Sequence, residues 1–142
     1  MKLNLKKSPS EWLFTTANET GAEVQLEASP KYGGKGKFLR PMENLLASLA
    51  SCASIDVLII LQKQKIEAED YQVDIEADRK EEVPGNFESI RLVFKARPTF
   101  ELQKFERAVE LAMTKYCSVA LSLDTNINLS WSVHFNPENN DI

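Results

Sequence analysis

Alternating apolar and polar positions near the start of the chain predict strands. Residues 3–5 and 22–28 follow the two-residue period of a half-buried strand, and residues 12–16 are rich in strand-forming types. The turn sequence Asn18–Gly21 separates the second and third of these segments and predicts a hairpin. The first part of the chain is therefore expected to form three strands.

A long apolar run at residues 45–61 predicts a helix instead. Pro41 suits the first helical position, and the helix is expected to end near Lys65. The run is shorter than the roughly 20 residues that a membrane-spanning helix needs, and it contains Asp56. We therefore expect a helix buried on every side rather than a membrane span, with a second subunit supplying part of the cover.

Two-residue and three-to-four-residue periods alternate in the second half of the chain. The predicted elements are a strand pair at 71–77 and 90–96, helices at 102–116 and 117–123, and a last strand at 127–135. Residues 136–142 are predicted to be a polar tail. The element order is βββ-α-ββ-α-α-β, an α+β fold, and no linker divides the single predicted domain of residues 1–142.

Composition narrows the classes of function. The chain has 142 residues and a net charge of −4, which disfavours a nucleic acid or an anionic membrane surface as partner. The N-terminus lacks the apolar segment of a secretion signal. We therefore expect a cytoplasmic protein, a compartment in which cysteines stay reduced unless chemistry oxidises them.

The two cysteines, Cys52 and Cys117, are the main candidates for chemistry. They are either inert core residues or a redox pair. Asp56 lies one helical turn after Cys52 and would disfavour its thiolate, so a reactive Cys52 needs a cation nearby. Arg40, three turns away, could supply it only from a partner subunit; otherwise it is an exposed loop residue. A position at a helix N-terminus would lower the pKa of Cys117.

Other polar residues give weaker signals. His134 falls on the polar face of the last strand and is expected at the surface; one histidine and two distant cysteines do not suggest a zinc site. The basic loop containing Lys31, Lys35 and Lys37 is either solvated or a lid over a site. No phosphate-binding glycine loop and no Ser-His-Asp arrangement can be identified.

Two segments resemble motifs of the OsmC/Ohr family of thiol-dependent hydroperoxide reductases. Residues 41–52 are similar to the family's Pro-Glu-Glu/Gln-Leu helix start, with Cys52 eleven residues after Pro41, as in the family. Residues 116–121 are similar to the family's Cys-Pro-Val segment. The resemblance covers nearly the whole chain and looks closest to the YhfA-like branch.

The resemblance implies an intertwined homodimer with long central helices between antiparallel sheets. It implies that Cys52 is the peroxidatic thiol and Cys117 the resolving thiol in oxidative-stress defence. Organic hydroperoxides would be the substrates and an external dithiol the reductant, and no metal, haem or flavin cofactor would be needed. Arg40, Glu43 and Asp56 are possible supporting residues.

Two departures from the family pattern keep an alternative open. The position after Pro41, which holds the family's catalytic glutamate, is Met42, and Glu43 follows one residue later. Arg40 is the only arginine before Cys52 and does not match the family's active arginine. The alternative is a member of the same fold that binds a small hydrophobic ligand or senses redox state without reducing peroxide.

Overall fold

The computed structural model describes residues 1–136, in two compact units. The first is Met1–Ala47, and the second begins at Ser48, inside helix α1. The predicted polar tail at 136–142 lies, from residue 137 on, outside the described residues. The prediction of a single domain stays a prediction, and the two units are described separately below.

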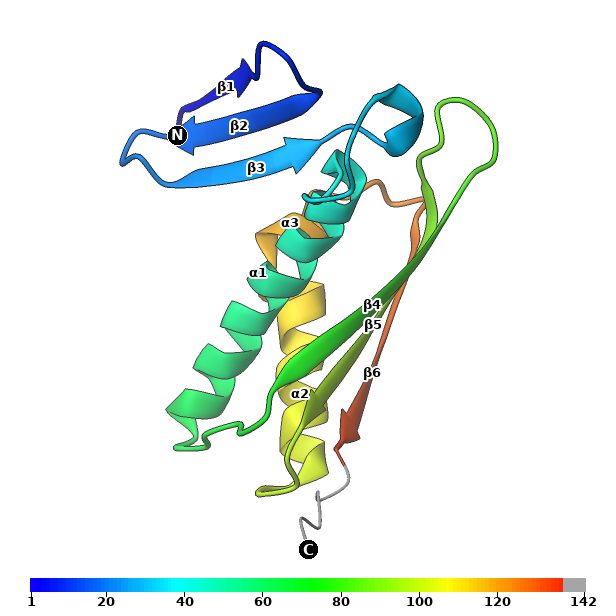
Figure 1. The fold of residues 1–142 in the computed structure, drawn as a ribbon. Helices are drawn as coiled ribbons and strands as arrows, with labels where there is room; N and C mark the ends of the chain where they lie inside the picture. The colour runs from blue at the N-terminus through cyan, green and yellow to red at the C-terminus, as the bar shows by residue number, and fades with distance from the viewer. Residues whose placement is uncertain (137–142) are drawn as a thin grey trace, which may run out of the picture. The chain divides into compact units, whose positions relative to one another are not determined.

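The first unit contains the three predicted strands as an antiparallel sheet in the order β1-β2-β3 (Figure 1). Its strands are β1 (Leu3–Lys7), β2 (Leu13–Asn18) and β3 (Glu23–Glu27). The predicted turn between β2 and β3 is present, and Gly21 adopts a left-handed φ of 84° there. A short 3-10 helix, Pro30–Tyr32, follows.

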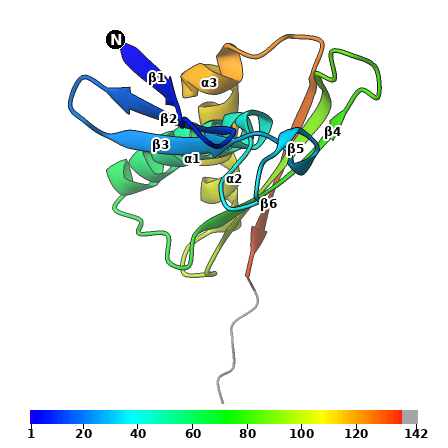
Figure 2. The ribbon, with the colours of Figure 1, turned by 45° about the horizontal axis from the view of Figure 1, so that its top comes forward.

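The second unit places helices beside a three-stranded sheet (Figures 1 and 2). Its elements are the greater part of α1 (Pro41–Lys63), β4 (Gln72–Arg79), β5 (Phe87–Ala96), α2 (Leu102–Leu111), a π-helical turn (Ala112–Tyr116), α3 (Ser118–Leu121) and β6 (Asn128–Phe135). The sequence of elements agrees with the predicted βββ-α-ββ-α-α-β order.

One predicted feature of this sheet is wrong. The resemblance implied antiparallel sheets, and β4 and β5 do pair antiparallel, but β5 and β6 are parallel. A parallel neighbour requires a crossover connection, and α2, the π-helical turn and α3 provide it between β5 and β6. The sheet is therefore mixed, with β5 in the centre.

The core of the second unit lies between the sheet and the helices. Alternate apolar residues of β5, namely Ile90, Leu92, Phe94 and Ala96, are at most 1% exposed. Opposite them are side chains of the helices that are 0% exposed: Leu49, Ala53, Val57 and Leu61 of α1, and Phe105, Ala108 and Val109 of α2. Phe105 also stacks on Phe135 of β6, with ring centroids 6.3 Å apart.

Within one chain, helix α1 is buried on one face only, and the predicted cover of its other face by a second subunit stays a prediction. Ile55, Leu58 and Ile59 are 60%, 39% and 43% exposed. By length and mean hydropathy (2.0), α1 could cross a membrane, a test that the core helix of a soluble protein also passes. Asp56 and the fully buried stripe that contains Val57 are typical of a helix packed in a protein core.

Candidate functional site

The two cysteines and Asp56 meet in the second unit. Cys52 and Asp56 are four residues apart on α1 and so share one face of the helix. Cys117 comes from the segment that follows α2, 65 positions further along the chain. The two Sγ atoms and a carboxylate oxygen of Asp56 all lie within 4.8 Å of one another. We call Cys52, Asp56 and Cys117 the thiol cluster.

A change in helical geometry places Cys117. The helix widens to a π-helical turn at Ala112–Tyr116, and the backbone N–H of Cys117 donates to the carbonyl of Ala112 at 2.8 Å. Such single π-turns occur frequently at functional sites. Cys117 then caps α3, and its Sγ accepts a hydrogen bond from the N–H of Ala120 at 3.4 Å. The thiol also faces the carbonyl oxygen of Leu49 on α1, at 4.0 Å.

Burial controls the ionisation of Cys117. Its side chain is 0% exposed, and this burial raises the pKa of the Cys117 thiol to about 11. The hydrogen bond from the N–H of Ala120 lowers this pKa, whereas the neighbouring Cys52 raises it further. The N–H groups at the start of α3 do lower this pKa, as expected of a helix N-terminus, but desolvation outweighs them and the net shift is upward.

Cys52 differs from Cys117 in its access to solvent. Both cysteines are free thiols, but Cys52 is only half-buried. By helical spacing, Cys52 and Asp56 lie between the buried stripe that contains Ala53 and the exposed pair Ile55 and Ile59. A small molecule that approaches from the exposed side of α1 would therefore meet Cys52 before Cys117.

Arg40 and Glu43 form a separate pair at the start of α1. The Arg40 guanidinium donates to Glu43, with Nε at 3.0 Å from Oε1, and the Arg40 backbone N–H donates to Oε2 at 2.8 Å. The second bond is half of a capping box. The ion pair lowers the pKa of the Glu43 carboxyl and raises that of Arg40. Eight residues of α1 lie between Glu43 and Cys52, and a supporting role for this pair stays a prediction.

The basic loop of the first unit is organised around Glu27, which the sequence analysis overlooked. This carboxylate is 5% exposed and accepts backbone N–H groups of Lys35 and Phe38, each at 2.9 Å. These bonds lower its pKa. Lys35 also pairs with Glu11. An acidic residue at the end of a strand before a glycine-rich loop could have signalled this arrangement, although spacing alone does not identify its donors.

His134 is exposed, as predicted, and its Nε2 lies 3.2 Å from the Ser132 hydroxyl. It takes no part in the thiol cluster, whose ligand-type groups come from α1 and from the cap of α3.

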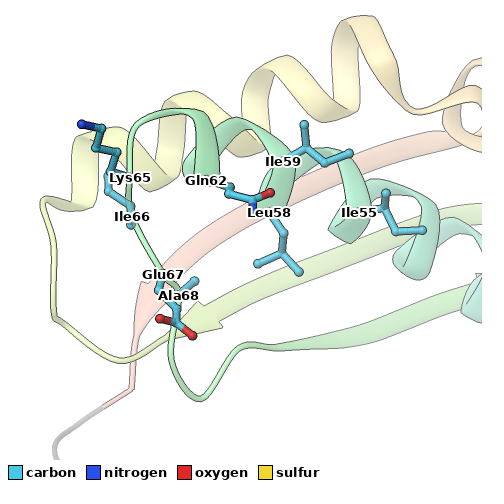
Figure 3. A pocket seen from close by; sticks show the side chains of 8 residues that line it. All are labelled: Ile55, Leu58, Ile59, Gln62, Lys65, Ile66, Glu67 and Ala68. Carbon is cyan, nitrogen blue, oxygen red and sulfur yellow. The ribbon is translucent and has the colours of Figure 1, made fainter.

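The exposed face of α1 forms one side of an open hollow of about 780 Å³ (Figure 3). Ile55, Leu58, Ile59 and Gln62 line it from the helix, and residues 65–68 line it from the following loop. Cys52 does not line this hollow, but Ile55 and Ile59 do, and they lie on the Cys52 side of the helix.

Comparisons with known proteins agree on one family. Residues 34–132 match the family described as "OsmC-like protein". The protein YhfA of Escherichia coli (strain K12) is 39% identical over 93 residues, which are 65% of this chain and 69% of YhfA. A hypothetical protein from Aquifex aeolicus VF5 has a solved structure with TM-score 0.77 and 33% identity, covering 96% of this chain and 97% of that one.

A more distant solved structure carries a functional name. It is the organic hydroperoxide resistance protein OhrB of Bacillus subtilis, with TM-score 0.65 and 15% identity over 94% of this chain and 96% of that one. At this identity the likeness concerns the fold alone.

Proposed function

Because the chain belongs to the OsmC-like family, we propose that it reduces organic hydroperoxides with Cys52 as the attacking thiol and Cys117 as the resolving thiol. The observation that carries this proposal is the thiol cluster, in which two free cysteines from distant parts of the chain come within 4.8 Å. Relatives in fold, such as OhrB, are named for organic hydroperoxide resistance.

The difference between the thiols supports the assignment of their roles. Cys117 is fully buried and, with a pKa of about 11, keeps its proton at neutral pH, so it is a poor first nucleophile. Cys52 is half-buried and open to a substrate. A resolving thiol needs only to reach the oxidised partner, and the distance within the cluster allows that after a rotation of the side chains.

The proposed cycle has three steps. The Cys52 thiolate attacks the distal peroxide oxygen, the S–O bond forms as the O–O bond breaks, and the alcohol leaves after taking a proton. Cys117 then attacks the sulfur of the Cys52 sulfenic acid, which releases water and leaves a disulfide. An external dithiol reduces the disulfide by thiol–disulfide exchange and returns both thiols.

We also propose that the protein works as a homodimer in the cytoplasm, without a membrane or a nucleic acid as partner. Ile55, Leu58 and Ile59 form an exposed apolar face on a helix whose opposite face is fully buried. A second copy that offers the same helix would cover this face through a closed two-fold interface. Such an interface would also supply an apolar approach to Cys52 for a hydrophobic peroxide.

Steady-state turnover with two variants tests this function. With dithiothreitol as reductant, the wild type is expected to consume cumene hydroperoxide, and Cys52→Ser is expected to lose this activity entirely. Cys117→Ser should still form the sulfenic acid at Cys52, which a dimedone adduct on that residue reveals. Unchanged activity in Cys52→Ser would contradict the proposal.

A second candidate function rests on the start of α1. Met42 occupies the position of the family's catalytic glutamate, and Glu43 is engaged as a cap and ion pair with Arg40. A binding or redox-sensing protein would need neither group for turnover. In that case the wild type would consume cumene hydroperoxide with dithiothreitol no faster than Cys52→Ser does.

A further inference from the structure

All three residues of the thiol cluster carry groups that can bind a metal ion. The proposed reduction of peroxide uses the two thiols but gives the Asp56 carboxylate no role. Cys52 and Asp56 present a sulfur and an oxygen from successive turns of α1, and Cys117 presents its sulfur from the cap of α3. Cysteine thiolates and Asp carboxylates are both zinc ligands, and three protein ligands leave a fourth position open, as in zinc sites that also hold a water.

The spacing of the three groups fits a tetrahedral zinc ion. With Zn–S bonds of about 2.3 Å and Zn–O bonds of about 2.0–2.2 Å, ligand atoms on one zinc lie roughly 3.5–3.8 Å apart. All three ligand atoms already lie within 4.8 Å of one another. Cys52 and Asp56 are only partly buried, so rotation of their side chains can bring their ligand atoms closer to Cys117.

The electrostatics of the cluster also favour a cation. When the thiols are deprotonated, three negative groups meet, and none of the ion pairs among residues 1–136 involves Asp56. A divalent ion would neutralise most of this charge. The N–H of Ala120, which donates to the Cys117 Sγ at 3.4 Å, is the kind of outer hydrogen bond that orients a metal-bound thiolate.

We propose that the reduced protein binds one zinc ion per chain through Cys52, Asp56 and Cys117, with water as the fourth ligand. The two thiols give up their protons, so binding of Zn²⁺ releases two protons to solvent. The zinc-bound form holds both sulfur atoms as metal thiolates and excludes the disulfide, since one sulfur pair cannot serve both. Zinc therefore competes with peroxide for the reduced cluster, and disulfide formation releases the metal.

Anaerobic titration of the reduced, metal-free protein tests this site. Co²⁺ serves as a spectroscopic probe, and the expected result is saturation at one ion per chain, with thiolate-to-cobalt charge transfer and the strong visible bands of tetrahedral cobalt. Zn²⁺ should then displace Co²⁺, and competition with a chromogenic chelator gives the zinc affinity. Visible cobalt absorption bands without thiolate-to-cobalt charge transfer would overturn the proposal. So would saturation that is reached only in large excess of metal.

Matched variants assign the ligands. Cys52→Ser and Asp56→Asn, at partly buried positions, are expected to weaken zinc binding by about tenfold or more. Asp74→Asn removes an exposed carboxylate of the same unit and should leave the affinity unchanged. Cys117→Ser should also lose the site; its circular dichroism shows whether it folds, and Cys52→Ser decides the question if it does not. Equal affinity in the Cys52, Asp56 and Asp74 variants would refute the site.

Separate measurements test zinc binding and the reduction of peroxide. Metal binding is measured on reduced protein without peroxide, and peroxide reduction is measured on metal-free protein with a chelator present. A protein that binds zinc but consumes no peroxide keeps this inference and loses the proposed function. One that consumes peroxide but shows no thiolate-bound cobalt keeps the function and loses the zinc site.

Discussion

The two faces of helix α1 carry similar apolar side chains in different surroundings. On one face, Val57 and Leu61 are 0% exposed; on the other, Leu58 and Ile59 are 39% and 43% exposed. The sequence is apolar on both, so composition does not distinguish them. The sheet and helices of the second unit therefore cover one face of this helix and leave the other exposed, and Cys52 lies at the boundary between the two faces.

The largest difference in stability between the two faces is expected when one leucine of each face is replaced by alanine. Leu61→Ala is expected to lower the free energy of unfolding by about 2–5 kcal/mol, because it removes a fully buried side chain and leaves a cavity. Leu58→Ala is the matched control and should lower stability far less in dilute protein. Denaturant titration measures both, and equal losses at every protein concentration would erase the distinction between the faces.

A charge on the exposed face should break the proposed dimer and leave the fold intact. Ile59→Asp places a carboxylate where a second copy would bury it unpaired, so association should be lost. Because Ile59 is 43% exposed within one chain, the circular dichroism spectrum should be retained. Sedimentation velocity reports the outcome. A wild type that is monomeric at micromolar concentration, or a variant that still dimerises, contradicts the proposed interface.

A smaller effect is expected on the inner side of α1, where the Tyr71 hydroxyl donates to the Ser54 hydroxyl at 3.0 Å. Tyr71→Phe should cost about 1 kcal/mol of unfolding free energy. Burial raises the pKa of Tyr71 from 10.0 to about 12, so in alkali the unfolded chain loses this proton first. The wild type should therefore lose stability between about pH 10 and 12, and Tyr71→Phe should lose less. Identical pH slopes would contradict the assignment.

The smallest effect is expected at the start of α1, where Glu43 pairs with Arg40 at the surface. Glu43→Gln keeps a side chain that can accept the Arg40 N–H but loses the charge, so only a slight decrease in melting temperature is expected. The lowered pKa of the Glu43 carboxyl means that the wild-type advantage disappears as pH falls through that pKa. Thermal melts at neutral and acidic pH measure it, and a decrease as large as that of Tyr71→Phe would be inconsistent with an exposed pair.

Elements and neighbours that follow from a short residue spacing could be predicted from the sequence. Contacts between segments that are distant in the sequence could not. The two-residue period over residues 90–96 predicted the strand β5, and the i,i+4 spacing placed Asp56 beside Cys52. The resemblance to the OsmC/Ohr family is confirmed by the comparisons. The pairing of Cys52 with Cys117 rested on that resemblance, because nothing local links the two segments.

Other features depend on tertiary context. The parallel pairing of β5 with β6 follows from the path of the crossover, and strand periodicity is the same in either direction. The raised pKa of Cys117 depends on burial that its sequence neighbours do not reveal. The sequence of α1 predicted cover on every side, part of it from a second subunit. One chain leaves Ile55, Leu58 and Ile59 exposed, since an apolar sequence shows which residues avoid water and not what covers them.

The most direct test of the proposed chemistry is intact mass spectrometry after a limiting dose of cumene hydroperoxide. The reduced, metal-free protein is expected to lose about 2 Da per chain as two thiols become one disulfide, and peptide mapping should find the bond between Cys52 and Cys117. In Cys117→Ser the same dose should add about 16 Da at Cys52 instead. Two free thiols and an unchanged mass after excess peroxide would contradict the account.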